Sequence, residues 1–190
     1  MSKQKVIYEI PNFPIKKHEG GLYGILFHET LNKQKKAIFK VGMADSYENR
    51  FENYHSYYPL GMYYSSLLVS PTKHKNEVKL DKTQSDTAKS KQKQYYKYVE
   101  EYIFRKLVEN GAERLRSTTR MPSANKYGGL TDFFYCNKKT LDGAFKKAHE
   151  RFDGRLLNAN LNHIEKQAAK NKRGSQYTAQ IHYTTHHHDT

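Results

Sequence analysis

The sequence is poor in cysteine, in acidic residues and in long apolar runs, and each shortage excludes a class of protein. Cys136 is the only cysteine, so the chain can form neither an intramolecular disulfide nor a zinc site built on several cysteines. A single thiol suits a reducing compartment, and we expect a cytoplasmic protein. No segment approaches the roughly 18 apolar residues of a membrane-spanning helix, and we find no basic amphipathic helix with a clean apolar face. We therefore expect no membrane partner.

Acidic residues are outnumbered, because 19 Asp and Glu face 33 Lys and Arg, which gives a formal net charge of +14. Such an excess attracts polyanions, and neutralisation of phosphates by Lys and Arg is the main source of sequence-independent affinity for nucleic acids. The charge therefore favours a nucleic-acid partner, which we expect to be DNA, over a merely soluble basic protein.

Length and apolar pattern predict one domain with appendages, since 190 residues suit a single core. Two apolar runs without a helical period, GLYGILF at 21–27 and AIFKVG at 37–42, predict a β-hairpin with a long polar loop. Residues 72–94 contain seven Lys and almost nothing apolar. We expect an insertion that is mobile in isolation, either a plain solvated loop or a basic flap that orders on a phosphate backbone.

Periodicity and end signals predict the remaining elements. A capping box at Asp45 and Glu48 begins a helix that places Tyr47, Phe51 and Tyr54 on one face. The other expected features are the end of that helix at Pro59 and Gly61, a strand at 62–70, a helix at 95–110 closed by Gly111, a strand at 130–136, a helix capped by Asn137 or Thr140 that runs through Phe152, and a last helix at about 155–172.

The common catalytic signatures are missing, because the chain contains no Walker loop, no GxSxG, no HExxH and no GxGxxG. One constellation of reactive residues remains. It comprises Tyr23 on the first expected strand, Lys40 on the second, Arg50 on the helix that follows, and Glu100 or Glu101 on the long helix.

In these residues the sequence resembles the GIY-YIG nucleases. The matching features are Gly21-Leu22-Tyr23 for the first motif, Lys40-Val41-Gly42 for the second with lysine in place of the usual tyrosine, Arg50, Glu100, and Asp132-Phe133-Phe134 for the closing aromatic strand of phage-type members. The resemblance runs from about residue 20 to 136, interrupted by the insertion. It implies an α+β fold with a small antiparallel sheet flanked by helices, preceded by an arm at 1–19 and followed by a helical extension at 137–172 and a flexible tail at 173–190.

The resemblance also implies an activity, a Mg²⁺-dependent (or Mn²⁺-dependent) DNA endonuclease. Glu100 would hold the metal ion and Arg50 would bind the scissile phosphate. Tyr23 would be the general base, with Lys40 lowering the pKa of its phenol or accepting the proton. His55 has either a companion role near the phosphate or the ordinary role of a histidine at a helix end.

Further residues complete the expected nucleic-acid contacts, which are Arg50, Lys73, Lys75, Lys91, Lys93 and Asn125. Asn125 is the best match for the asparagine that often follows the glutamate, ahead of Asn110 and Asn137. Two alternatives stay open: a non-catalytic regulator or inhibitor on the same fold, and a basic interaction protein of unrelated fold. The oligomeric state is left open by the sequence.

Overall fold

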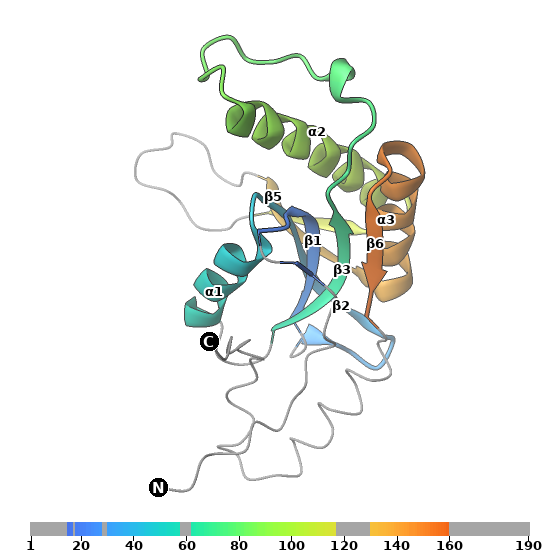
Figure 1. Cartoon of the computed structure of the whole chain (residues 1–190). Coiled ribbons are helices and arrows are strands. Elements are labelled where there is room, and N and C mark those ends of the chain that lie inside the picture. The colour runs from blue at the N-terminus through green and yellow to red at the C-terminus, as the bar shows by residue number, and fades with distance from the viewer. Residues whose placement is uncertain (1–14, 17, 28–29, 58–61, 117–129, 160–190) are drawn as a thin grey trace, which may run out of the picture.

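The centre of the protein is one antiparallel sheet whose six strands lie in the order β4-β5-β2-β1-β3-β6 (Figure 1). The computed structural model describes residues 15, 16, 18–27, 30–57, 62–116 and 130–159. The strands in these ranges are β1 (Gly21–Phe27), β2 (Lys36–Ala44), β3 (Met62–Val69), β4 (Glu113–Arg116), β5 (Leu130–Asn137) and β6 (Arg155–Asn158). The helices are α1 (Tyr47–Tyr57), α2 (Ala88–Glu109) and α3 (Lys138–Phe152), with a 3-10 turn, η2, at Lys75–Glu77. The predicted α+β class, a small antiparallel sheet flanked by helices, is confirmed.

The hairpin of β1 and β2 forms the middle of the sheet, as the two apolar runs predict. Its register places Gly21 opposite Ala44 and Tyr23 opposite Gly42. On its other side β1 pairs with β3, and β2 pairs with β5. Because β1 has a neighbouring strand on both sides and helices on both faces, six of its seven residues are buried.

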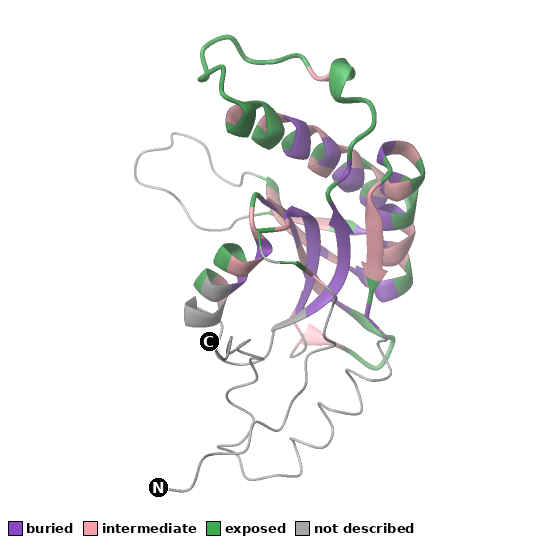
Figure 2. Cartoon of the chain, viewed as in Figure 1, coloured by how far each residue is buried: buried purple, intermediate pink, exposed green. Residues whose placement is uncertain are grey.

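The two faces of the sheet carry separate apolar cores, because successive side chains of a strand point to opposite sides. One core joins Leu22, Phe39 and Leu68 to residues of α2 and α3. The other joins Tyr23 and Ile25 to residues of α1. The buried residues accordingly follow the central strands and the sheet-facing sides of the helices (Figure 2). The face to which a polar strand side chain points therefore decides whether it lies on the side of α1 or on the side of α2 and α3.

The face of α1 that helical spacing predicts packs on the sheet. Tyr47 and Phe51 are buried and Tyr54 is half-buried. The Tyr47 hydroxyl lies 2.9 Å from the carbonyl oxygen of Leu22 and 3.1 Å from that of Leu68. This hydroxyl ties the first turn of α1 to β1 and β3, and so sets where the rest of the helix lies.

Two helices begin at other residues than the sequence predicts. The residue before α1 is Ser46, so it takes the cap position predicted for Asp45. α2 begins at Ala88 rather than at residue 95, and therefore includes the last part of the predicted insertion. Thr87 caps α2, because its hydroxyl accepts a hydrogen bond from the Ser90 amide. The Lys and Gln residues that follow are good helix formers, so this stretch is helical without an apolar stripe.

The C-terminal part of the described chain joins the same sheet, which corrects the prediction of a separate extension. α3 forms as predicted, and its cap is Asn137, whose side-chain oxygen accepts from the Thr140 amide. A strand, β6, stands where the last predicted helix would begin, and it pairs with β3. β4 lies in a stretch for which the sequence predicts a loop. Both are four-residue edge strands.

Some predictions fall on residues outside the described ranges. These are most of the N-terminal arm, the helix end at Pro59 and Gly61, Asn125, the rest of the last predicted helix, and the tail. Within the described ranges, no helix combines the length and the apolar character needed to cross a membrane.

Gly42 allows the Tyr23 ring to lie directly against β2. A Cβ atom at position 42 would lie 2.3 Å from the Tyr23 hydroxyl oxygen and 2.5 Å from the ring carbon that carries it. On its other side the Tyr23 ring meets the rings of Phe51 and Tyr54 edge to face, with centroids 5.7 and 5.9 Å apart. The ring thus fills the space between β2 and α1, and packing requires glycine in the Lys-Val-Gly motif.

Replacing Gly42 with alanine is expected to lower the free energy of unfolding by about 1–3 kcal/mol, because the Tyr23 ring has to move. Gly143, in α3, is a matched control, since a Cβ atom there meets nothing within 4 Å. Gly143→Ala is expected to raise the free energy of unfolding by about 0.5–1 kcal/mol through helix propensity. Urea unfolding followed by circular dichroism measures both. Similar values for the two variants would contradict the packing argument.

Candidate functional site

Polar side chains from five elements gather where β5 stops pairing with β2. The last paired residues are Lys40 in β2 and Phe133 in β5. Asp132, one residue before Phe133, forms an ion pair with the Lys40 amine. The charges of Lys40 and Asp132 both act on Glu100 of α2, and those of Asp132 and Arg50 act on Tyr23. We call the following residues the polar cluster: Tyr23, Lys40, Arg50, Tyr54, Glu100 and Asp132.

Tyr54 is a member of this cluster that the sequence analysis treats only as a packing residue. Its hydroxyl oxygen lies 2.5 Å from that of Tyr23, and either can be the donor. Two cations flank its ring, because the Lys40 amine lies 5.9 Å and the Arg50 guanidinium carbon 6.0 Å from the ring centroid. The signal for Tyr54 in the sequence is its place four residues after Arg50, on the same turn of helix.

The structure corrects the expectation that Lys40 makes Tyr23 a base. Burial raises the pKa of Tyr23 well above its usual value, and the hydrogen bond with Tyr54 raises it further. The Arg50 charge acts in the opposite direction, and its effect is smaller. The Lys40 amine is directed to Asp132 instead. At neutral pH Tyr23 is therefore a neutral hydrogen-bonding group rather than a phenolate.

Glu100 is the carboxylate of α2 that faces the cluster. Burial, and after it the negative charge of Asp132, raise the pKa of Glu100 to about 7, against the opposing effect of Lys40 and Lys97. Glu101, in contrast, is exposed. Of the two glutamates that the sequence leaves open, Glu100 is thus the one that borders the buried stripe of α2.

The two carboxylates of the cluster are hard oxygen donors, the kind of ligand that suits Mg²⁺ or Mn²⁺. Within the described residues, no group of three or more His, Cys, Asp and Glu side chains could hold a metal ion. Mg²⁺ keeps most of its water and needs only one or two carboxylates from the protein. Burial, and after it the charge of Asp132, raises the pKa of Glu100, and a bound cation would favour its ionised form. Among the described residues, Glu100 and Asp132 could supply such carboxylates.

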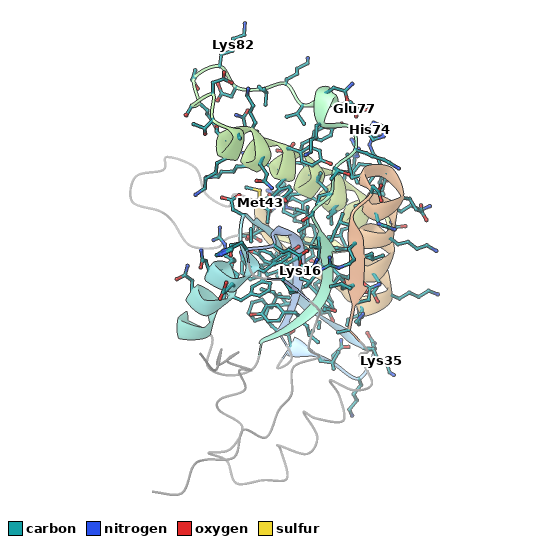
Figure 3. All side chains as sticks on the ribbon, viewed as in Figure 1. Lys16, Lys35, Met43, His74, Glu77 and Lys82 are labelled. Carbon is teal, nitrogen blue, oxygen red and sulfur yellow. The ribbon has the colours of Figure 1, made fainter. Side chains whose placement is uncertain are left out.

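Other predicted contact residues lie elsewhere or have structural roles. Lys73 pairs with Asp153, its amine 3.4 Å from the carboxylate, and the Lys75 amine lies 5.5 Å from the Tyr95 ring centroid. Lys91 pairs with Asp86 at 2.7 Å. The segment that carries Lys73 and Lys75 extends away from the sheet, with Lys82 at its outer end (Figure 3).

The asparagine candidates that the structure describes, Asn110 and Asn137, have structural roles at helix ends. Asn110 ends α2, where its side-chain amide donates to the Lys106 carbonyl, and the predicted glycine after it, Gly111, has φ 83°. Asn137 is the cap of α3. His55 is in α1, but its side chain is outside the described part of the structure, and so is Asn125.

Comparisons of the chain with known protein families, with curated proteins and with solved structures found no match.

Glu100→Gln is expected to stabilise the protein at pH 8 but to change its stability little at pH 4. The unfolded carboxyl ionises around its usual pKa of 4.5, and the folded one at about 7. Because folding disfavours the ionised form, the wild type loses stability relative to the variant as pH rises between these values. Urea unfolding at pH 4, 6 and 8 measures the difference, with the exposed neighbour Glu101→Gln as the control. A difference that is independent of pH would contradict the assignment.

Asp132→Asn is expected to lower the pKa of Glu100 from about 7 toward 4.5. The substitution removes a negative charge that raises this pKa and leaves the charge of Lys40 unopposed. Titration of the Glu100 side-chain carboxyl by carbon NMR measures the pKa. Glu101→Gln, which removes a weaker like charge, is expected to lower it less. An equal effect of the two variants would show that Asp132 lies too far from Glu100 for the cluster to act as one site.

Proposed function

We propose that the protein is a metal-dependent endonuclease of the GIY-YIG type that hydrolyses phosphodiester bonds in DNA. The observation that carries the proposal is the polar cluster itself. Its members are residues on which the resemblance rests, Asp132 among them, together with Tyr54, and the charge of Asp132 acts on Glu100. The net charge of +14 supports a polyanionic substrate.

Arg50 is the group that binds the scissile phosphate. Its side chain is exposed, its guanidinium lies beside the Tyr54 ring, and it pairs with no carboxylate that the structure describes. A planar guanidinium in this situation can form a bidentate contact with phosphate oxygens and stabilise charge in the transition state. Lys40 is unlike Arg50, because Asp132 neutralises it.

Glu100 and Asp132 are the groups that hold the metal ion. A bound divalent ion supplies a water of lowered pKa and neutralises charge on the phosphate. The phenols of Tyr23 and Tyr54 have a role that differs from the general-base role that the resemblance implies for Tyr23. Tyr23 is neutral and buried, and it hydrogen-bonds Tyr54. The hydrogen-bonded pair of Tyr23 and Tyr54 therefore supports the part of the cluster that would contact the substrate. Removal of a proton from the attacking water is left to other groups.

The test is cleavage of supercoiled plasmid DNA by the full chain with Mg²⁺ or Mn²⁺, with single-stranded DNA and RNA as further substrates. Glu100→Gln and Arg50→Ala are each expected to reduce the cleavage rate about 100-fold or more, as is usual for loss of an electrostatic group that acts on the transition state. Glu101→Gln is the matched control and should cleave at the wild-type rate. The proposal fails if the wild type cuts none of the substrates, or if Glu100→Gln cuts as fast as Glu101→Gln.

The second candidate is a non-catalytic nucleic-acid-binding protein on the same fold. Two observations favour it: the Lys40 charge is neutralised by Asp132, and the pKa of Tyr23 is raised rather than lowered. Such a protein would bind DNA in a salt-sensitive way and leave it intact with either metal. The plasmid assay, with binding measured in parallel, distinguishes the two functions.

A further inference from the structure

Three lysines of α2 form a row that leads to Glu100. Lys89, Lys93 and Lys97 are each four residues apart, so helical geometry places them along one side of α2. Glu100 follows Lys97 by three residues and lies on the same side. All three lysines are exposed, and the charge of Lys97 acts on Glu100. We call these three residues the lysine row.

The lysine row differs from the other basic residues of α2 because its charges are not neutralised. Lys91, which helical geometry places on the opposite side, pairs with Asp86 at 2.7 Å. Lys106 pairs with Glu109 at 2.6 Å, and the same carboxylate lies 3.8 Å from Arg105. No carboxylate that the structure describes pairs with Lys89, Lys93 or Lys97. The first turn of α2 also contains no acidic residue, so the row keeps its full charge.

The dimensions of the row match a nucleic-acid strand. Residues four apart on a helix are about 6 Å apart along its axis, so the row spans about 12 Å. One strand of duplex DNA carries a phosphate about every 3.4 Å along the axis, so the row faces roughly three to four phosphates. Arg50, on the opposite face of the sheet, belongs to the cluster at which the row ends.

We propose that the lysine row is the surface that holds the phosphate backbone of the nucleic acid and leads it to Glu100. The proposal rests on the nucleic-acid substrate of the proposed function, but not on cleavage. It narrows the prediction of a basic flap at residues 72–94, because Lys89 and Lys93 lie in the helical end of that range and the rest of the range precedes α2. The segment before α2 leaves the body of the protein with Lys82 at its outer end, and His74 and Glu77 lie beside its 3-10 turn (Figure 3). Lys82 therefore lies away from the sheet that carries the polar cluster (Figure 3).

The test is the salt dependence of binding to a 20-base-pair DNA duplex, measured by fluorescence anisotropy of the full chain in EDTA, so that no cleavage occurs. The triple variant Lys89→Gln, Lys93→Gln, Lys97→Gln is expected to reduce the slope of log affinity against log salt by about 2–3, because each phosphate contact contributes about 0.9. The control, Lys75→Gln, Lys79→Gln, Lys82→Gln, removes the same charge from the segment before α2. Its slope is expected to stay within about 1 of the wild type.

Each outcome of this experiment either supports or overturns the proposal. A reduced slope in the row variant alone supports it, provided that both variants melt at the wild-type temperature. An equal reduction in both variants, or none in the row variant, overturns it, and so does a wild type that does not bind DNA. A wild type that binds DNA through the row but cuts no substrate in Mg²⁺ or Mn²⁺ keeps this proposal and rejects the nuclease.

Discussion

The close approach of the Tyr23 ring to Gly42 is the constraint on which the site depends. The two residues are opposite each other in the central pair of strands, and only the absence of a side chain at position 42 leaves room for the ring. The ring then offers its other side to Phe51 and Tyr54, and so sets the distance between α1 and the sheet. Because Arg50 is on the same helix, its position follows from this packing as well. A glycine that carries no functional group thus determines where a functional guanidinium lies.

Charge balance within the cluster decides which groups can react. Asp132 neutralises Lys40, so no lysine charge remains to lower the pKa of Tyr23. Burial, and after it the charge of Asp132, raises the pKa of Glu100 to about 7 against the opposing charges of Lys40 and Lys97. The group that titrates near neutral pH is therefore a carboxyl group and not a phenol. In the proposed function, the two carboxylates and the exposed Arg50 would carry the chemistry, while the tyrosines supply shape and hydrogen bonds.

Local patterns in the sequence predict the hairpin, the packed face of α1 and the stripe of α2, because alternation and helical period are properties of neighbouring residues. Glu100 could be found from that stripe. The ion pair of Lys40 and Asp132 could not, since the residues are 92 positions apart and meet only through the register of β2 and β5. The edge strands β4 and β6 have four residues each, too few to show a period. The start of α2 lacks an apolar stripe, so only its cap and helix-forming residues mark it.

The ion pair of Lys138 and Asp142 differs from the ion pair of Lys40 and Asp132 in its surroundings. Lys138 and Asp142 are four residues apart on α3, their charged atoms are 2.5 Å from each other, and Lys138 is 6% exposed. A serine hydroxyl of β3 donates to the other carboxylate oxygen at 2.6 Å, so this pair also ties α3 to the sheet. The pair of Lys40 and Asp132 differs, because Asp132 is 39% exposed and a third ionisable group, Glu100, lies near it. The pair in α3 is therefore a contact within the fold, whereas the pair of Lys40 and Asp132 is open to solvent and interacts with a third ionisable group, as groups at functional sites often do.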